Sequence, residues 1–76
     1  MKELVEYIVK ALVDKPEDVR INEVKSEKTI ILELKVAQED IGKVIGKQGR
    51  IIKAIRVVIN AAAAKTMSRV VLEILD

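Results

Sequence analysis

The chain has 76 residues, half of them apolar, with 14 basic and 12 acidic side chains and a formal net charge of +2. This length fits one small domain spanning residues 1–76. Because the sequence contains neither Cys nor His, it excludes disulfides, Cys/His zinc sites and an imidazole general base, and we expect no metal, no cofactor and no enzymatic activity.

Residues 2–13 are predicted to form an amphipathic helix, because apolar side chains recur there at helical spacing. Pro16 ends this helix, since proline cannot continue the hydrogen-bond ladder. Residues 19–25 and 29–36 then predict two strands joined by a short polar turn. In the first strand Val24 falls out of phase, which suggests a bulge. In the second, one face carries Ile30, Leu32, Leu34 and Val36.

Two further helices and a third strand are predicted in the second half. A short helix over residues 39–45 carries acids in its first turn, where the helix dipole favours them, and stops at Gly46. A longer helix begins near Arg50, and its predicted core face carries Ile51, Ile52, Ile55, Val58, Ile59 and Ala62. Residues 69–75 predict a closing strand. The order α-β-β-α-α-β predicts a two-layer α+β fold with three helices on one face of a three-stranded sheet.

The sequence shows neither a signal peptide nor a membrane span. The N-terminal residues lead directly into the first helical pattern, without a continuous apolar core. The longest nearly apolar stretch, residues 57–64, is interrupted by Asn60 and is far shorter than the roughly 20 residues that cross a bilayer. We therefore expect a cytoplasmic protein with no membrane partner.

Charge is distributed unevenly between the two halves. Residues 1–40 carry seven basic and ten acidic side chains, whereas residues 41–76 carry seven basic and two acidic ones. Such a local basic field attracts polyanions, although a charge run alone is more often an ordinary solvated face. The cations nearest to the glycine pair described next are Lys43, Lys47, Arg50, Lys53 and Arg56.

The segment Gly46-Lys47-Gln48-Gly49 lies between the two predicted helices of this basic half. Glycine has no Cβ and adopts positive φ at little cost, so a sugar-phosphate backbone can approach the main chain closely. Two glycines alone are weak evidence, because many turns between helices contain glycine. Here apolar residues also flank the pair, and the whole run reads Val44-Ile45-Gly46-Lys47-Gln48-Gly49-Arg50-Ile51-Ile52.

On these nine residues the chain resembles the KH domain family, whose signature is Val/Ile-Ile-Gly-x-x-Gly-x-x-Ile, and the element order resembles the type II KH topology. The resemblance covers the whole chain. It implies a loop that grips about four nucleotides of single-stranded RNA beside an apolar groove, whose strand wall we assign to a residue such as Leu34. The residues expected to bind RNA are Ile41, Gly42, Lys43, Ile45, Gly46, Lys47, Gln48, Gly49, Arg50 and Lys53.

Aromatic residues are nearly absent, since Tyr7 is the only one. RRM, cold-shock and single-strand-binding OB surfaces need aromatic platforms on which bases stack, so these modules are excluded. We expect Tyr7 to lie at the edge of the core rather than to contact a base.

A small apolar patch on the outer face of the longer helix is either ordinary surface or a dimer interface, and it consists of Val57, Ala61 and Ala64. The resemblance to stand-alone bacterial KH proteins implies self-association, pairing with a larger KH-containing RNA-binding protein, a role as RNA chaperone or post-transcriptional regulator, and a link to cell-envelope homeostasis and cell shape. The alternative is a protein-interaction module that binds RNA weakly or binds single-stranded DNA. A phosphate-binding enzyme is disfavoured because the loop lacks the P-loop pattern, and no small-molecule substrate is expected.

Overall fold

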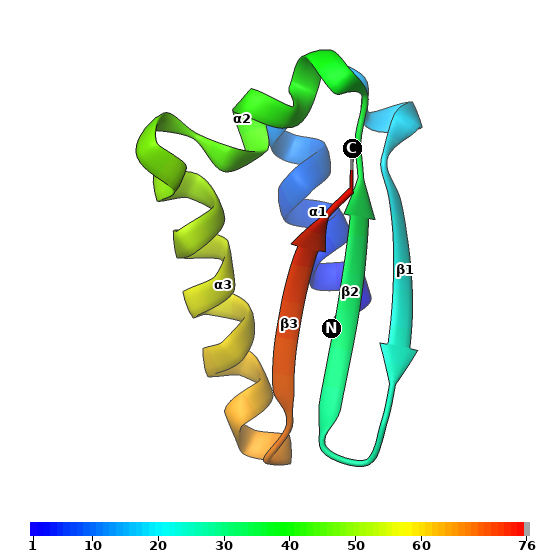
Figure 1. Ribbon diagram of the computed structural model, residues 1–76, viewed down its shortest axis with the longest axis vertical. Helices are drawn as coiled ribbons and strands as arrows, with labels where there is room; N and C mark the ends of the chain where they lie inside the picture. The colour runs from blue at the N-terminus through cyan, green and yellow to red at the C-terminus, as the bar shows by residue number, and fades with distance from the viewer. Residues whose placement is uncertain (76) are drawn as a thin grey trace.

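The computed structural model describes residues 1–75 and contains three helices and three strands in the predicted order α-β-β-α-α-β (Figure 1). Single turns of 3₁₀ helix lie in the connections. The predicted segments are confirmed, with ends displaced by one or two residues. Their bounds are α1 Lys2–Leu12, β1 Arg20–Lys25, β2 Thr29–Lys35, α2 Ile41–Ile45, α3 Arg50–Ala63 and β3 Arg69–Ile74.

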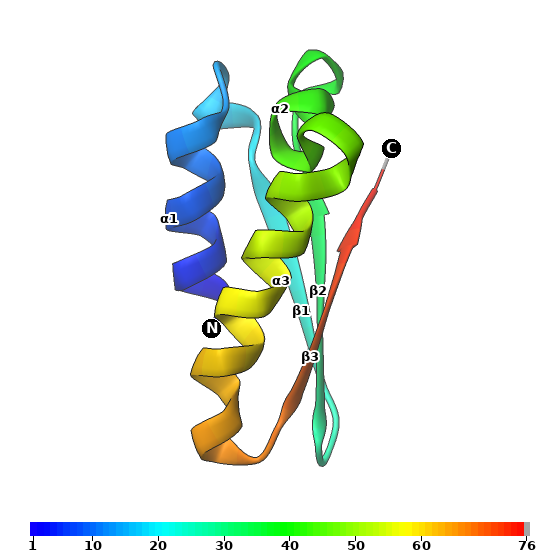
Figure 2. The ribbon, with the colours of Figure 1, turned by 90° about the vertical axis from the view of Figure 1, so that its left-hand side faces the viewer.

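Strand β2 is the centre of the mixed sheet, with β1 antiparallel on one side and β3 parallel on the other. All three helices lie on one face, as predicted, and the opposite face is open (Figure 2). The bulge suggested at Val24 is wrong, because pairing runs without a break from Arg20 opposite Lys35 to Lys25 opposite Ile30. Val24 instead pairs with Ile31, and its side chain is 48% exposed.

The core lies between the sheet and the helices and is almost entirely aliphatic. Alternation along β2 buries the face that the sequence predicts, and α1 adds two valines one helical turn apart. Side chains from every layer are fully enclosed, including Val5, Val9, Leu32, Leu34, Val44 and Ile59. Tyr7 is not at the core edge as expected but is 77% exposed, because α1 turns Val5 and Val9 inward.

The core face of α3 is rotated from the predicted one. Val58 is 48% exposed and Ala62 is also exposed, whereas Ala63, assigned to no face from the sequence, is buried. Helix α3 contacts the sheet along one line of residues three or four apart. The predicted core positions next to this line therefore fall on the flank of α3 that faces α1. The buried line is Ile52, Ile55, Ile59 and Ala63. Within residues 1–75, no helix is both long and apolar enough to cross a membrane.

Candidate nucleic-acid interface

The connection between α2 and α3 is a tight turn that requires glycine at its first position. Gly46 has φ +76°, and its N–H donates to the Gly42 carbonyl at 2.9 Å. A Cβ at position 46 would lie 2.5 Å from Cγ1 of Ile51, far inside van der Waals contact. Both the left-handed backbone and the packed isoleucine therefore exclude any other residue here without strain.

Two left-handed residues follow each other at the end of the turn. Gln48 has φ 57° and Gly49 has φ 74°, and the Gly49 N–H donates to the Gly46 carbonyl at 3.1 Å. A non-glycine residue in this region is uncommon and marks local strain, which often accompanies a functional site. The turn leaves the side chains of Lys47 and Gln48 exposed to solvent.

Helix α3 begins immediately after this turn without a side-chain cap. Its first backbone N–H groups carry the partial positive charge of a helix N-terminus, which favours an anion. Arg50 donates to the side-chain oxygen of Gln48 at 3.2 Å, and Lys53 lies exposed one turn further on. Within residues 1–75, Lys47, Arg50 and Lys53 form no ion pair. The turn therefore joins a helix terminus to three cations that no carboxylate neutralises.

Helix α2 presents a small apolar surface beside the turn. Val44 is buried and anchors the helix, whereas Ile41 and Ile45 are half-buried and Gly42 is exposed. Nothing lies within 4 Å of the position that a Cβ on Gly42 would occupy, and its backbone is right-handed helical. The fold therefore does not require glycine at position 42, and the missing side chain leaves open surface on the helix.

The strand residue assigned to the groove wall is wrong. Leu34 has no exposed surface, because it points into the core between the sheet and the helices. The accessible side of Ile41 instead faces a depression of about 490 Å³ beyond the end of β2, lined by Lys35, Val36, Gln38 and Ile41.

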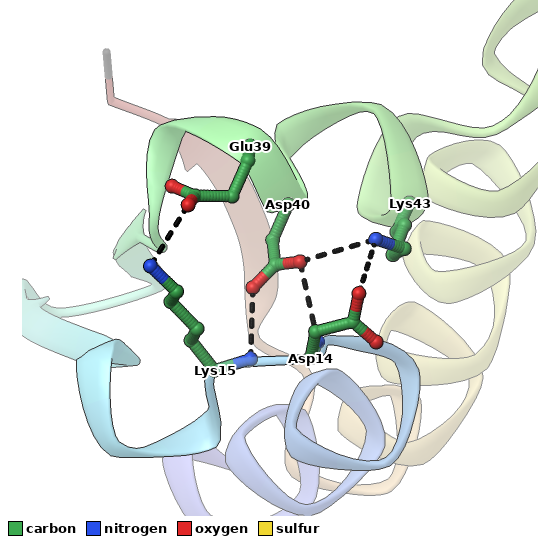
Figure 3. A network of polar contacts seen from close by, with 5 residues as sticks. All are labelled: Asp14, Lys15, Glu39, Asp40 and Lys43. Atoms are coloured by element: carbon green, nitrogen blue, oxygen red, sulfur yellow. Dashed lines mark hydrogen bonds and ion pairs between the residues drawn. The ribbon is translucent and has the colours of Figure 1, made fainter.

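A buried carboxylate fixes the start of α2 to the connection that follows α1 (Figure 3). Asp40 has no exposed surface, and its oxygens accept the backbone N–H groups of Asp14 at 3.2 Å and Lys15 at 3.0 Å. Burial raises the pKa of this carboxyl, but the two N–H donors and the Lys43 ammonium outweigh it, so the pKa lies below its ordinary value. Sequence reasoning assigned Asp40 only a local dipole role, because its partners lie 25 and 26 residues away.

The same junction holds Lys43, one of the predicted RNA-binding residues. Its ammonium lies 2.7 Å from a carboxylate oxygen of Asp14 and 3.5 Å from one of Asp40. The hydrogen bond to Asp14 raises the pKa of Lys43. A second ion pair, between Lys15 and Glu39 at 2.8 Å, also links the connection after α1 to the segment before α2. Two carboxylates thus compete with any phosphate for Lys43, in contrast to the three unpaired cations at the turn.

Replacing Asp40 by Ala should lower the melting temperature by about 10 °C, because two buried N–H groups lose their acceptor. A depressed pKa contributes stability above the ordinary value near 4, and this contribution is lost as pH falls through the folded value. Thermal melts by circular dichroism at pH 7 and pH 3 should therefore show a smaller pH effect in Asp40→Asn than in the parent chain. Glu27→Gln, at an exposed position in the turn between β1 and β2, removes a carboxylate outside this junction and is the control. If the melting temperature of Asp40→Asn changed with pH as much as that of the parent chain, the proposed stabilising role of the Asp40 carboxylate would be contradicted.

A mixed three-stranded sheet, helices on one face and a glycine turn between α2 and α3 together define the class of KH domains. Residues 2–74 match the family model described as KhpA/KhpB, KH domain, and the chain belongs to this family. It is 69% identical over 75 residues to the RNA-binding protein KhpA of Clostridium perfringens, covering 99% of this chain and all of the relative. Identity to the RNA-binding protein KhpA of Borreliella burgdorferi is 58% over 74 residues, 97% of this chain and 90% of that one.

Proposed function

We propose that this chain is a non-catalytic RNA-binding protein that grips about four nucleotides of a single strand with Gly46-Lys47-Gln48-Gly49. The observation that carries the proposal is the left-handed glycine turn, which exposes Lys47 and Gln48 beside the uncapped N-terminus of α3. Relatives that match over nearly the whole chain are named RNA-binding proteins, which supports the same reading.

In this proposal the phosphates lie against the turn and the bases against α2. The backbone of Gly46 and Gly49, the side chains of Lys47 and Gln48 and the α3 terminus contact the sugar-phosphate chain, with Arg50 and Lys53 adding charge. Ile41, Gly42 and Ile45 form an aliphatic wall for the bases. Lys43 contributes less than the other cations, because Asp14 and Asp40 hold it.

RNA affinity should fall steeply with salt, because phosphate contacts release counterions. If three to four phosphates are neutralised, the slope of log K against log salt should be about −2 to −3 for a single strand. Fluorescence anisotropy with labelled oligouridylate between low and moderate salt measures this slope. A slope near zero would contradict phosphate gripping, and equal affinity for oligothymidylate would show that the site does not distinguish RNA from single-stranded DNA.

A second candidate function, self-association, rests on the outer face of α3. Val57 is 69% exposed, and Ala61 and Ala64 are exposed beside it, where small side chains permit close approach of a second helix. Pairing with a larger KH-containing protein, a chaperone or post-transcriptional role and a link to cell-envelope homeostasis and cell shape rest on the family resemblance alone. RNA binding and self-association are compatible, since the turn and this patch are separate.

Ala61→Asp should shift a dimer toward the monomer, because it places a charge in an apolar interface without a partner. Sedimentation velocity at several concentrations checks this expectation. Ser26→Asp, in the exposed turn between β1 and β2, adds the same charge outside this patch and should leave the mass unchanged. An unaltered mass distribution in Ala61→Asp would show that this patch is not the interface.

A further inference from the structure

The open face of the sheet carries a row of three β-branched apolar side chains. Val24 of β1 pairs with Ile31 of β2, and Ile31 pairs with Val71 of β3. The strand neighbours Leu32 and Leu72 are buried in the core, so alternation places this apolar row on the side away from the helices (Figure 2). The row gives Val24, which falls out of phase with the core pattern of β1, apolar neighbours on the open face.

Charged side chains flank the apolar row, with opposite signs on its two sides. Two residues after the row, Glu33 of β2 and Glu73 of β3 lie directly opposite each other. Two residues before the row, Thr29 is paired with Arg69 in the same way. Like charges opposite each other on neighbouring strands destabilise a sheet, so a cation placed against the two glutamates would be stabilising. The open face therefore has an acidic side, an apolar centre and a basic side.

Arg69 and Glu73 cannot neutralise each other within one chain. They are four residues apart on β3, which separates them by about 13 Å along the strand. Both side chains are exposed, and within residues 1–75 neither forms an ion pair. The two exposed charges therefore lie on opposite sides of the apolar row, at equal distances from it.

This order of charges is complementary to itself. If a second copy is turned by 180° about an axis along the apolar row, the strands of the two sheets run antiparallel and the two apolar rows face each other. Arg69 of each copy then faces Glu73 of the other, and Glu33 faces Thr29. The other two-fold axis, along β2, would place Glu33 against Glu33, and such a like-charge contact is unfavourable. The charges thus select one of the two symmetric arrangements.

We propose that a second copy of this chain docks on the open face of the sheet in this two-fold arrangement. Aligned sheets pack about 10 Å apart, which lets the side chains of the two apolar rows interdigitate. This inference goes beyond the proposed function. The open face also differs from the patch on α3, so chains that use both surfaces would assemble beyond a dimer.

The size of the open face makes this contact weak. Three strands about 4.8 Å apart and roughly 20 Å long present about 300 Å² on each copy. Stable interfaces bury about 800 Å² on each partner, so we expect a dissociation constant of about 0.1–1 mM. The contact is therefore populated at high local concentration and is nearly absent in dilute solution.

The test uses Ala61→Asp as the background, because this change removes the α3 patch from any association. Dilution of the isotope-labelled protein from about 1 mM to about 50 µM should shift the amide signals of the apolar row. Arg69→Glu and Glu73→Arg should each weaken association about tenfold or more, because each change turns two ion pairs into two like-charge contacts. Sedimentation equilibrium over the same concentrations measures the association constant.

Exchanging the two charges should restore the contact. The double variant Arg69→Glu with Glu73→Arg keeps the net charge of the background chain and re-forms both ion pairs in the opposite sense, so it should associate about as strongly as that chain. An equal mixture of the two single variants should also associate, because each supplies the charge that the other lacks. Lys2→Glu and Glu3→Arg, at exposed positions of α1, make matching changes in charge and should leave association nearly unaltered.

Three results would each overturn the proposal. They are the absence of concentration-dependent shifts in the apolar row, single charge reversals that associate as well as the background chain, and a double variant that remains monomeric. Circular dichroism verifies the fold of each variant, and if one single variant is unfolded, the other single variant and the double variant decide. Because no RNA is present, these results leave the proposed RNA-binding function unaffected.

Discussion

Lys47→Asp combined with Gln48→Asp is expected to lower RNA affinity by about 30-fold or more while the protein remains folded. Both side chains are exposed at the turn, so their replacement removes no packing. Each new carboxylate near a phosphate costs about 1 kcal/mol in water-like surroundings, and the cationic contact of Lys47 is lost as well. Anisotropy titration measures the affinity, and circular dichroism and thermal melting verify the fold.

A matched control variant distinguishes the loss of contacts at the turn from the effect of a changed net charge on RNA affinity. Lys2→Asp with Tyr7→Asp alters the formal charge by the same amount at two exposed positions of α1. This control should bind RNA with close to parental affinity, apart from a small effect of the changed long-range field. Equal losses in both double variants would show nonspecific attraction, and retained binding in the loop variant would contradict the proposed grip.

Gly46→Ala should have the largest effect on stability, about 2–4 kcal/mol. The new Cβ would lie 2.5 Å from Cγ1 of Ile51, and alanine is strained at φ +76°. The turn must then move, so RNA affinity falls together with stability. Chemical denaturation measures the loss as a lower midpoint with an unchanged slope.

Gly42→Ala is the matched control, because α2 is right-handed at this glycine and leaves open space beside it. Alanine is favoured over glycine inside a helix by up to about 1 kcal/mol, so stability should stay equal or rise. If bases lie against α2 as proposed, the added methyl group should nevertheless weaken RNA binding. A destabilised Gly42→Ala variant would contradict the geometry of α2, and a neutral Gly46→Ala variant would contradict that of the turn.

The elements and the turn could be predicted because their signals are local. Alternation along residues 29–36 identifies the buried face of β2, and Pro16 marks the end of α1 within a few residues. Gly46 and Gly49 were predicted to allow positive φ, and both adopt it. Each of these features depends only on residues that are close together in the sequence.

The rest depends on contacts between distant segments. The flank of α3 that contains Val58 is partly exposed because α1 and α3 leave an apolar groove of about 360 Å³ between them, which periodicity cannot show. Asp40 carried an acidic helix-start signal, but its bonds to Asp14 and Lys15 require the folded chain. Leu34 lies on the apolar face of β2 that the alternation predicts. That face packs against the helices in the core, so Leu34 cannot form the wall of an open groove.

The most direct measurement is an amide chemical-shift titration of the isotope-labelled protein with octauridylate. The account predicts that the largest changes fall on residues 41–53 and that α1 and β1 remain nearly unaffected. Changes confined to the α1–α3 groove or the open face of the sheet, with the amides of Gly46 and Gly49 unmoved, would contradict the proposal that this turn grips RNA.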